Sequence, residues 1–302
     1  MSNSGFVLLD KIAGETSFKA LFPLKRVFST KRVGHAGTLD LRASGLIIAA
    51  TGRCTRLLPF VEAKDKCYSF RLHLGYETDT LEWDGEVVEQ DERVKQSITR
   101  DDLEKVLPQF TGNIEQIPPK YCGVKINGVR ASDLMERGRN IELKPRKIHI
   151  GELKVIGEGE VTEGCSGKEF ATFDLICECS KGTYIRALGR DIGRALGTYA
   201  CVSQIRRHRI GNVTLDKAVR GDALTRENLL PVDAVLDFPV VRLTDEQVAV
   251  IRQGNWLPWK TPVEGVGPEG HVFAANMQGE VLALCFYEPG RIKPKFYLGE
   301  DE

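Results

Sequence analysis

The sequence predicts an α+β fold with a larger domain over residues 1–238 and a small β-rich domain over residues 239–302. Three observations lead to this prediction. The chain of 302 residues is longer than a minimal domain requires, and 42% of it is hydrophobic, enough for a sizeable core. Strand-like and helix-like segments alternate without the regular spacing of βαβ units, which favours α+β over a doubly wound sheet. Asp237-Phe238-Pro239 then breaks the pattern before a strand-rich end.

Two buried strands and a helix are predicted in the first fifty residues. Residues 6–10 are apolar up to Asp10, which is typical of a short buried strand. Ser17 precedes an amphipathic stretch and is a suitable cap for a helix over residues 18–28. A loop that contains three glycines then leads to a second buried strand over residues 46–50.

A half-exposed strand and a capped helix follow. Apolar and polar residues alternate over residues 68–74, which is the period of a strand with one buried face. Thr99 is a suitable N-cap for a helix over residues 101–107, and Pro108 stops that helix because proline has no backbone N–H to donate. Residues 112–146 differ in character, with prolines and glycines among basic and polar side chains. We expect a long functional insertion there.

The rest of the larger domain is predicted to hold two strands and a helix. Residues 153–156 and 170–178 have strand-like sequences, and a helix is predicted over residues 184–196 after a turn at Gly182. Beyond the break, a strand over residues 240–243, a short helix ending at Gly254 and strand-rich sequence fit a compact β-module.

The net charge is zero, with 42 basic and 42 acidic residues, but the charges are segregated along the chain. Residues 24–56 hold seven basic residues against one acid, and residues 181–220 hold nine against two. Residues 77–115 compensate with twelve acids against four bases. Such a division is typical of a polyanion-binding face with an acidic back.

Composition favours a protein of a reducing compartment. The longest apolar runs, such as residues 46–50, are far shorter than the roughly 18 residues of a membrane span. The first ten residues lack the basic segment of a secretion signal. The eight cysteines, Cys165 among them, include no C-x-x-C pair. We therefore expect reduced structural thiols, no metal site, no membrane and a cytoplasmic location.

The densest functional signal is the stretch Val33-Gly-His-Ala-Gly-Thr-Leu-Asp40. Its two glycines allow a tight turn and a close approach of the backbone to a ligand, and a histidine and a carboxylate lie in the same loop. It is not a phosphate-binding P-loop, since no Gly-Lys-Ser/Thr follows. On its own the stretch fits either a ligand-binding loop or a capped turn before a strand.

Further blocks extend this signal over most of the chain. They lie, in order, at residues 7–11, 34–56, 66–85, 116–128, 180–193 and 205–207. Gly34-His-Ala-Gly-Thr-Leu-Asp40, Lys66-Cys-Tyr68 and Ser180-Lys-Gly-Thr-Tyr-Ile-Arg186 among them resemble motifs of the TruB family of tRNA pseudouridine synthases. The sequence departs from the family at Ile12 and Leu41, where proline is common, which concerns loop rigidity rather than a reacting group.

The resemblance implies a pseudouridine synthase fold with a mixed, mainly antiparallel sheet, an RNA-gripping insertion at about 112–146 and a C-terminal PUA-like domain. It also implies an isomerase, without a cofactor, that breaks the C1′–N1 bond of uridine, turns the uracil and joins C1′ to C5. Asp40 is the implied catalytic carboxylate, and Arg186 the guanidinium that favours its anion and orients it. Tyr68 would stack on the target base and move a proton. A carboxylate can attack the ring, attack the sugar, or remove a sugar proton.

Four further residues are implied to bind the substrate. His35 would hold the flipped-out nucleotide, because a stacked base must leave its stack before C1′ can be reached. Tyr184 and Ile205 would form apolar walls of the pocket, and Lys125 belongs to the RNA-gripping insertion. In the C-terminal domain, phosphate contacts are expected from Arg291, Lys293 and Lys295.

The expected partner is tRNA, bound through its T-arm, with position 55 of the T-loop as the target and the enzyme acting as a monomer without a protein partner. A guide-RNA-dependent synthase shares the motifs, but the insertion argues against it because standalone enzymes grip the T-arm with that segment. A non-catalytic RNA-binding or RNA-folding protein would not need Asp40, Tyr68 and Arg186 together. A small-molecule enzyme would not need two basic segments and an insertion.

Overall fold

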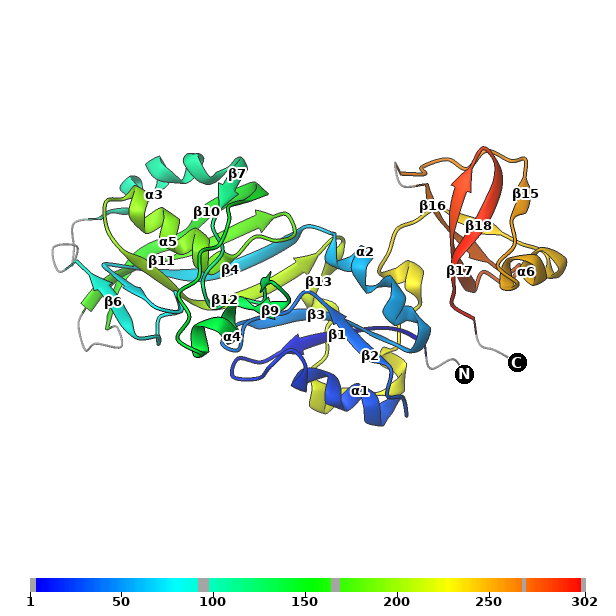
Figure 1. Cartoon of the computed structure of the whole chain (residues 1–302), viewed down its shortest axis with the longest axis horizontal. Helices are drawn as coiled ribbons and strands as arrows, with labels where there is room; N and C mark the ends of the chain where they lie inside the picture. The colour runs from blue at the N-terminus through cyan, green and yellow to red at the C-terminus, as the bar shows by residue number, and fades with distance from the viewer. Residues whose placement is uncertain (1–3, 92–97, 164–168, 268–269, 300–302) are drawn as a thin grey trace.

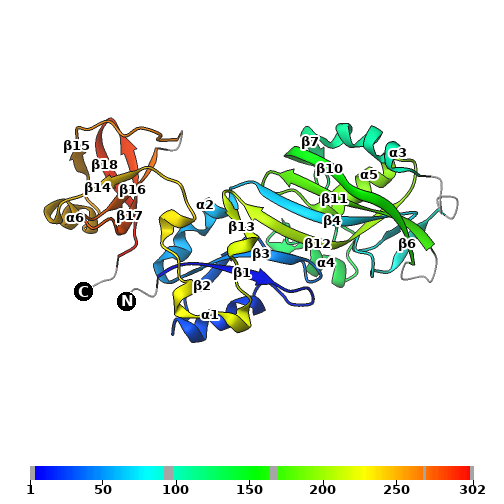
Figure 2. The same cartoon turned by 180° about the vertical axis from the view of Figure 1, so that it is seen from behind.

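The computed structural model describes residues 4–91, 98–163, 169–267 and 270–299 of the chain. Two β-sheets form the framework: a nine-stranded sheet from residues 5–214 and a five-stranded sheet from residues 240–297. The smaller sheet stands at one end of the long axis, and the hairpin of β10 (Arg146–Glu163) and β11 (Glu169–Cys179) reaches toward the other end (Figures 1 and 2).

The large sheet is mixed and mainly antiparallel, as predicted. Besides β10 and β11, its strands are β1 (Gly5–Lys11), β2 (Val33–Ala36), β3 (Ser44–Thr51), β4 (Lys66–Leu74), β7 (Gly112–Gln116), β12 (Ala200–Ile210) and β13 (Val213–Thr214). Their order is β1-β3-β12-β4-β11-β10-β7, with β2 paired to β3 and β13 to β12. Only β3 and β12 pair in parallel among these described strands. β3 lies between β1 on one side and β12 with β2 on the other, and seven of its eight residues are buried.

Helices and short hairpins surround this sheet. The helices are α1 (Phe22–Val27), α2 (Leu58–Glu62), α3 (Arg100–Val106), α4 (Ala131–Glu136) and α5 (Ile185–Ala195). Two small hairpins pair β5 (Tyr76–Thr78) with β6 (Val87–Gln90) and β8 (Lys125–Ile126) with β9 (Val129–Arg130). The predictions of a helix capped by Thr99 and of a helix after Gly182 are confirmed, since α3 begins at a capping box on Thr99 and α5 follows the Gly182 turn.

The position of α5 on the sheet is set by two glycines. A Cβ at Gly189 would lie 2.3 Å from the Cγ1 of Val202, and one at Gly193 would lie 2.5 Å from the Cβ of Ala200. Real Cβ atoms do not approach this closely, so only glycine lets the helix lie directly on β12. This close packing also fixes the position of Arg186, because Arg186 is the second residue of α5.

The helix predicted over residues 18–28 is broken into two pieces. A 3-10 turn, η1 (Lys19–Leu21), precedes α1, and Pro23 lies in the first turn of α1, where a missing N–H is tolerated. The prediction that Ser17 caps this helix is wrong. The Ser17 hydroxyl instead donates to the carbonyl oxygen of Leu39 and accepts from the Leu39 N–H.

The excursion from the large sheet is shorter than the predicted insertion 112–146. Residues 112–116 form β7, which pairs with the start of β10, so residues 117–145 alone leave the sheet. They form the β8–β9 hairpin and α4, with a small core of Cys122, Ala131 and Leu143. The boundary could not be read from the sequence because the partner of β7 lies about 30 residues further along the chain.

The C-terminal sheet has the order β14-β16-β17-β18-β15. Its strands are β14 (Val240–Arg242), β15 (Leu257–Trp259), β16 (His271–Ala275), β17 (Val281–Glu288) and β18 (Gly290–Tyr297), with the helix α6 (Asp245–Arg252) beside them. This sheet has a hydrophobic cluster of its own. An aromatic cluster joins it to the larger body: the Phe60 ring lies 5.5 Å from that of Phe238 and 5.0 Å from that of His271.

No helix in the described ranges is long and apolar enough to cross a membrane. The seven cysteines within those ranges are buried free thiols, which agrees with the prediction of reduced structural cysteines. The eighth, Cys165, lies outside the described residues. Burial raises the pKa of the Cys54 and Cys285 thiols to about 12, so neither is a thiolate at neutral pH.

Candidate active site

Asp40 and Arg186 form a two-pronged ion pair between segments 146 residues apart. The Nε of Arg186 donates to Oδ2 of Asp40 and its Nη2 donates to Oδ1, both at 2.9 Å. Two parallel bonds fix the plane of the carboxylate as well as its position. The side chain of Arg186 is 5% exposed, whereas that of Asp40 is 41% exposed. The carboxylate is therefore accessible from solvent, while the cation that holds it is buried.

Arg186 also holds two further segments at this point. Its Nη1 donates to the carbonyl oxygen of Thr80 at 2.8 Å, and its Nη2 donates to that of Tyr121 at 3.0 Å. Thr80 lies just after β5, and Tyr121 lies near the start of the excursion 117–145. One guanidinium thus joins the Asp40 loop, the β5–β6 hairpin and the excursion.

The loop that carries Asp40 is anchored by two polar side chains near the N-terminus. Ser17 exchanges hydrogen bonds of 2.9 and 3.0 Å with the backbone of Leu39. Lys11 is 1% exposed, and its ammonium donates to the carbonyl oxygens of residues 12, 41 and 43. Burial lowers the pKa of Lys11, and the nearby carboxylates of Glu15 and Asp40 act in the opposite direction.

The two departures from the family's proline pattern lie at the edge of this loop. Ile12 is 46% exposed and Leu41 is 48% exposed. Their carbonyl oxygens both accept hydrogen bonds from Lys11, and that of Leu41 also accepts from the N–H of Gly14. The loop conformation is therefore held by buried hydrogen bonds where a proline ring would have restricted the backbone.

Tyr68 lies in β4, directly opposite Arg207 of β12. Tyr68 is half-buried and packs against the main hydrophobic cluster. Burial raises the pKa of its phenol, and the positive charge of Arg207 together with a hydrogen bond between the two side chains acts in the opposite direction. The phenol is therefore a neutral donor at neutral pH, next to a fixed cation.

Arg207 holds the two ends of the Asp40 loop through hydrogen bonds to its backbone. Its side chain is 1% exposed, its Nε donates to the carbonyl oxygen of Leu46 at 2.7 Å, and its Nη2 donates to that of Gly37 at 2.9 Å. The backbone also makes a close approach: Gly45 has a φ of +102°, and a Cβ there would lie 2.3 Å from the carbonyl oxygen of Arg207. Glycine at position 45 is thus required for β3 and β12 to meet beside the loop.

His35 lies in β2, opposite Ala49 of β3, at the start of the Asp40 motif. Burial lowers the pKa of its imidazole and the charge of Arg207 lowers it further, so the ring is neutral at neutral pH. Its Nδ1 makes no hydrogen bond within the described part of the chain. That nitrogen is itself buried, so it does not face solvent in this structure.

Tyr184 is the N-cap residue of α5 and faces the excursion. Gln116 holds its backbone at both ends: the Tyr184 N–H donates to Oε1 of Gln116 at 2.8 Å, and Nε2 of Gln116 donates to the Tyr184 carbonyl oxygen at 3.2 Å. Burial raises the pKa of the Tyr184 phenol to about 12, and its contact with Cys122 acts in the same direction. The side chain packs against the small core of the excursion.

Ile205 and Lys125 differ in their relation to Asp40. Ile205 follows a β-bulge in β12, where Gln204 has a φ of +52°, and it packs in the same cluster as Leu39 and Tyr68. Lys125 is exposed on the β8–β9 hairpin, opposite Arg130. Ile205 therefore shares a hydrophobic cluster with two residues of the site, whereas no contact joins Lys125 to Asp40 within the described residues.

Three charged residues near the centre were not predicted as site residues. Lys11 and Arg207 hold the Asp40 loop, and Glu82 is half-buried beside the Asp40–Arg186 pair. Burial raises the pKa of Glu82, while Arg186 acts to lower it and Asp40 to raise it. All three lie inside the motif blocks at residues 7–11, 66–85 and 205–207. Lys11 and Arg207 mainly contact backbone carbonyl groups. Every residue has such a group, so the sequence does not indicate which ones these side chains bind.

Much of the positive charge of residues 181–220, which was expected to form a polyanion-binding face, is paired within the protein. Six of the nine basic residues there form salt bridges within the described chain, and a seventh, Arg207, is buried. Arg206 with Asp10 and Arg209 with Glu178 are examples, at 2.9 and 2.6 Å. This segment uses its positive charge to hold strands together. The basic residues at 24–32 remain at the surface or partly exposed.

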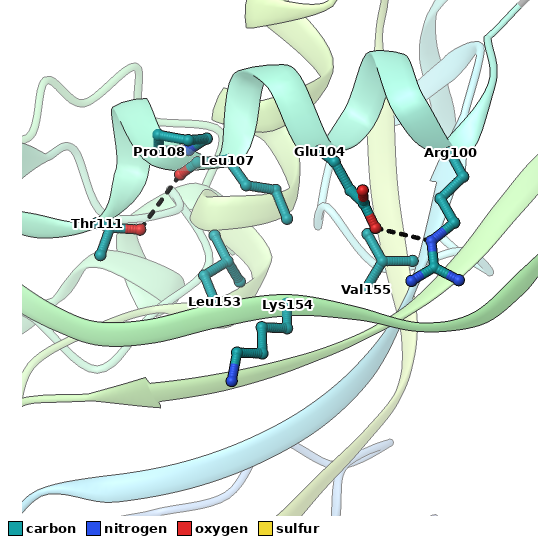
Figure 3. Close-up of a pocket in the computed structure, with 8 residues that line it drawn as sticks. All are labelled: Arg100, Glu104, Leu107, Pro108, Thr111, Leu153, Lys154 and Val155. Carbon is teal, nitrogen blue, oxygen red and sulfur yellow. Dashed lines mark hydrogen bonds and ion pairs between the residues drawn. The ribbon is translucent and has the colours of Figure 1, made fainter.

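A hollow of about 480 Å³ lies between α3 and β10, and none of the predicted site residues lines it (Figure 3). Leu107, Leu153 and Val155 form an apolar floor, and Arg100 is paired with Glu104 at its rim. At the Asp40 centre the described residues offer no metal site either, since no three His, Cys, Asp or Glu side chains come close enough to share an ion.

The comparison with known proteins agrees with the geometry. Residues 25–185, more than half of the chain, match the model of the TruB family pseudouridylate synthase (N terminal domain). The chain belongs to the TruB family. A tRNA pseudouridine synthase B of Caulobacter sp. (strain K31) is 36% identical over 305 residues, which cover 96% of this chain and 94% of that one. A protein of the same name from Borrelia garinii subsp. bavariensis is 33% identical over 281 residues, covering 93% and 94%.

Solved structures support the TruB-family fold over the whole chain. An H/ACA RNP bound to a substrate RNA containing 2′-deoxyuridine has a chain with a TM-score of 0.70 and 20% identity, covering 99% of this chain and 86% of that one. The archaeal box H/ACA sRNP Nop10-Cbf5 complex gives 0.68 and 20%, covering 98% and 86%. At this identity the likeness concerns the fold. Family membership makes the chain an isomerase of the pseudouridine synthase class.

Proposed function

We propose that this TruB-family enzyme converts the uridine at position 55 in the T-loop of tRNA to pseudouridine, without a guide RNA. The alignments with relatives named tRNA pseudouridine synthase B cover 96% of this chain. The observation that carries the chemistry is the half-exposed Asp40 carboxylate held by two bonds from the buried Arg186. The enzyme acts as a cytoplasmic monomer and needs no protein partner or cofactor.

Asp40 starts the reaction, as a nucleophile or as a base. Both of its oxygens accept a bond from Arg186, and each keeps a further lone pair for the substrate. The C1′–N1 bond breaks, the detached uracil turns within the site, and C1′ joins C5. The proton lost from C5 is balanced by the one gained at N1, so no oxidant, reductant or second substrate is consumed.

Tyr68 and Arg207 assist the ring while it is detached. The phenol ring stacks on the uracil, and its neutral hydroxyl relays the proton from C5: it releases its own proton to water and takes up the C5 proton in return. Arg207, opposite Tyr68 in the β4–β12 register, stabilises negative charge that develops on the phenol oxygen during that transfer. The hydrogen bonds of Arg207 to the backbone keep the cation in place through the reaction.

The remaining predicted residues surround the flipped-out nucleotide. The partly exposed ring of His35 holds the nucleotide, Ile205 and Tyr184 form apolar walls, and Lys125 contacts a phosphate from the hairpin of the excursion. Residues 1–238 form the catalytic domain, and residues 239–302 form a PUA-like domain that binds tRNA away from the target uridine. Of the cations expected there, Lys295 lies 3.0 Å from Nε2 of His271, among the rings that join the two sheets.

An unmodified tRNA transcript labelled with tritium at C5 of uridine tests this proposal. The purified chain alone should release one tritium per tRNA, and a transcript with cytidine at position 55 should release none. Asp40→Asn protein should bind the same transcript without release. Product that forms only after a guide RNA is added would support a guide-dependent synthase, and binding without product would support a non-catalytic RNA-binding protein. Either result would overturn the proposal.

A further inference from the structure

The outer face of the helical segment 18–27 is aromatic and basic. Its inner face is buried, with Ala20, Leu21 and Leu24 no more than 6% exposed. On the outer face, Phe18 is 60% exposed and Phe22 is 46% exposed. A surface helix normally presents polar side chains to water, and exposed large apolar groups that lie together mark an interaction site.

The two phenylalanines form one unit with a cation. Their ring centroids lie 5.5 Å apart, with the planes at 83°. The ammonium of Lys25 lies 5.0 Å from the centroid of Phe18 and 5.1 Å from that of Phe22. Arg26 is exposed on the same side of α1. We call Phe18, Phe22, Lys25 and Arg26 the outer stripe of α1.

The charge of this segment has one sign. No aspartate or glutamate occurs between residues 18 and 32, where lysine and arginine occur five times. Within the described chain, neither Lys25 nor Arg26 forms a salt bridge. A protein surface that is positive and aromatic, and whose cations have no carboxylate partner among the described residues, is complementary to a polyanion with exposed π-faces.

The outer stripe begins next to the active site. Ser17, the residue before Phe18, is fixed by two hydrogen bonds to Leu39, the residue before Asp40. In Figure 1, α1 lies beside β1, which leads into the loop with Ser17, and β2, which leads into the loop with Asp40. From Phe18 to Arg26 a helix rises about 12 Å, which matches three to four base steps of about 3.4 Å.

We propose that the outer stripe of α1 is an RNA-binding surface continuous with the active site, where Phe18 and Phe22 stack on unpaired nucleobases and Lys25 and Arg26 contact the flanking phosphates. The inference rests on the proposed function in that the RNA is the substrate of the Asp40 site. It adds a contact that the sequence motifs do not include. Base stacking on aromatic side chains tolerates any sequence, so the stripe contributes affinity rather than choice of uridine.

Binding of an unmodified tRNA transcript to the Phe18→Ala/Phe22→Ala double variant tests the stacking. We expect the Kd to rise about tenfold or more. KM should rise equally, while kcat at saturating tRNA stays at the wild-type value, because Asp40 and its partners are untouched. Val88→Ala is the matched control: Val88 is also exposed, at 52%, but lies on β6 beside two glutamates. It should bind tRNA as the wild type does.

Two further variants report direct contact. Phe18→Trp should show fluorescence quenching on tRNA binding beyond that of the wild-type tryptophans. Lys25→Gln should reduce the slope of log K against log salt by about 0.7 to 0.9, as expected for the loss of one phosphate contact.

The outcomes separate this inference from the proposed function. If the wild type forms no pseudouridine in tRNA, the proposed function fails. If the wild type is active but the double variant binds tRNA within about twofold of it, the stripe does not contact RNA and this inference is overturned. That second result is also the one expected if the stripe docks a protein instead.

Discussion

Replacing Arg186 by lysine tests whether the geometry of the contact with Asp40, rather than the mere presence of a cation, supports catalysis. The guanidinium makes four hydrogen bonds: two to Asp40 and one each to the carbonyl oxygens of Thr80 and Tyr121. A lysine keeps the charge, but its ammonium is a point donor that cannot form two parallel bonds to a carboxylate. We expect Arg186→Lys to lose at least two of the four.

The magnitude follows from the bonds that are lost. A hydrogen bond to a charged group contributes about 1.5–3 kcal/mol, so two of them amount to about 3–6 kcal/mol. If the poorer orientation of Asp40 raises the activation free energy by about 3 kcal/mol, kcat falls about a hundredfold. The remainder lowers the free energy of unfolding, because Arg186 is buried and also holds backbone groups of two other segments.

The assay is single-turnover tritium release with enzyme in excess over tRNA, together with urea unfolding of the same proteins. Arg190→Lys is the matched control. Arg190 lies one turn further along α5, is 8% exposed, and donates to Asp191 and to the carbonyl oxygen of Ile117. It should lose stability but keep its rate. The reasoning is refuted if Arg186→Lys turns over at the wild-type rate, or if Arg190→Lys is slowed as much.

Four further predictions concern single side chains. Asp40→Asn should bind tRNA nearly as the wild type does but form no pseudouridine, and measurable turnover would remove Asp40 from its catalytic role. Tyr68→Phe should bind tRNA and turn over slowly, since stacking survives without the hydroxyl; full activity would reduce Tyr68 to a stacking platform. Gly45→Ala should lower the free energy of unfolding by about 3 kcal/mol or more in urea titration, because its Cβ would meet the Arg207 carbonyl oxygen at 2.3 Å and its φ is +102°; an unchanged midpoint would contradict the close approach. Burial lowers the pKa of His73 to about 4, and Arg71 adds to this, so the unfolded chain takes up a proton first as the pH falls from 6.5 to 4. Up to about 3 kcal/mol of stability should be lost over that window. His73→Gln should reduce this slope and leave the part due to other histidines with lowered pKa values, such as His35; the same slope in wild type and variant would refute the assignment.

The sequence predicted the candidate reacting groups from the order and spacing of its motifs. A carboxylate in a glycine-containing loop, a tyrosine in an alternating strand and an arginine at the start of a helix each also fit an ordinary structural role when taken one at a time. Their convergence could be expected from the resemblance of the motifs. The bidentate contact between Asp40 and Arg186 agrees with that expectation.

The periodicity of the chain also determined most elements of the sheet. Strands near residues 6–10, 46–50 and 68–74 were predicted, because alternation or continuous apolarity is a local property. The extent of the excursion was not, because whether residues 112–116 leave the sheet depends on pairing with β10. Pairing over such a separation is decided by the whole sheet and not by either strand.

The tertiary structure alone decided which charges act inside the protein and which face outward. Lys11 and Arg207 are buried and hold the Asp40 loop through backbone carbonyl oxygens, whereas a count of charges had assigned residues 181–220 to a polyanion-binding face. A residue's type fixes its charge, but burial and the nearest acceptor fix what that charge does. The same holds for Phe18 and Phe22: their apolarity predicts a core, and only the direction of the helix places them at the surface beside the active site.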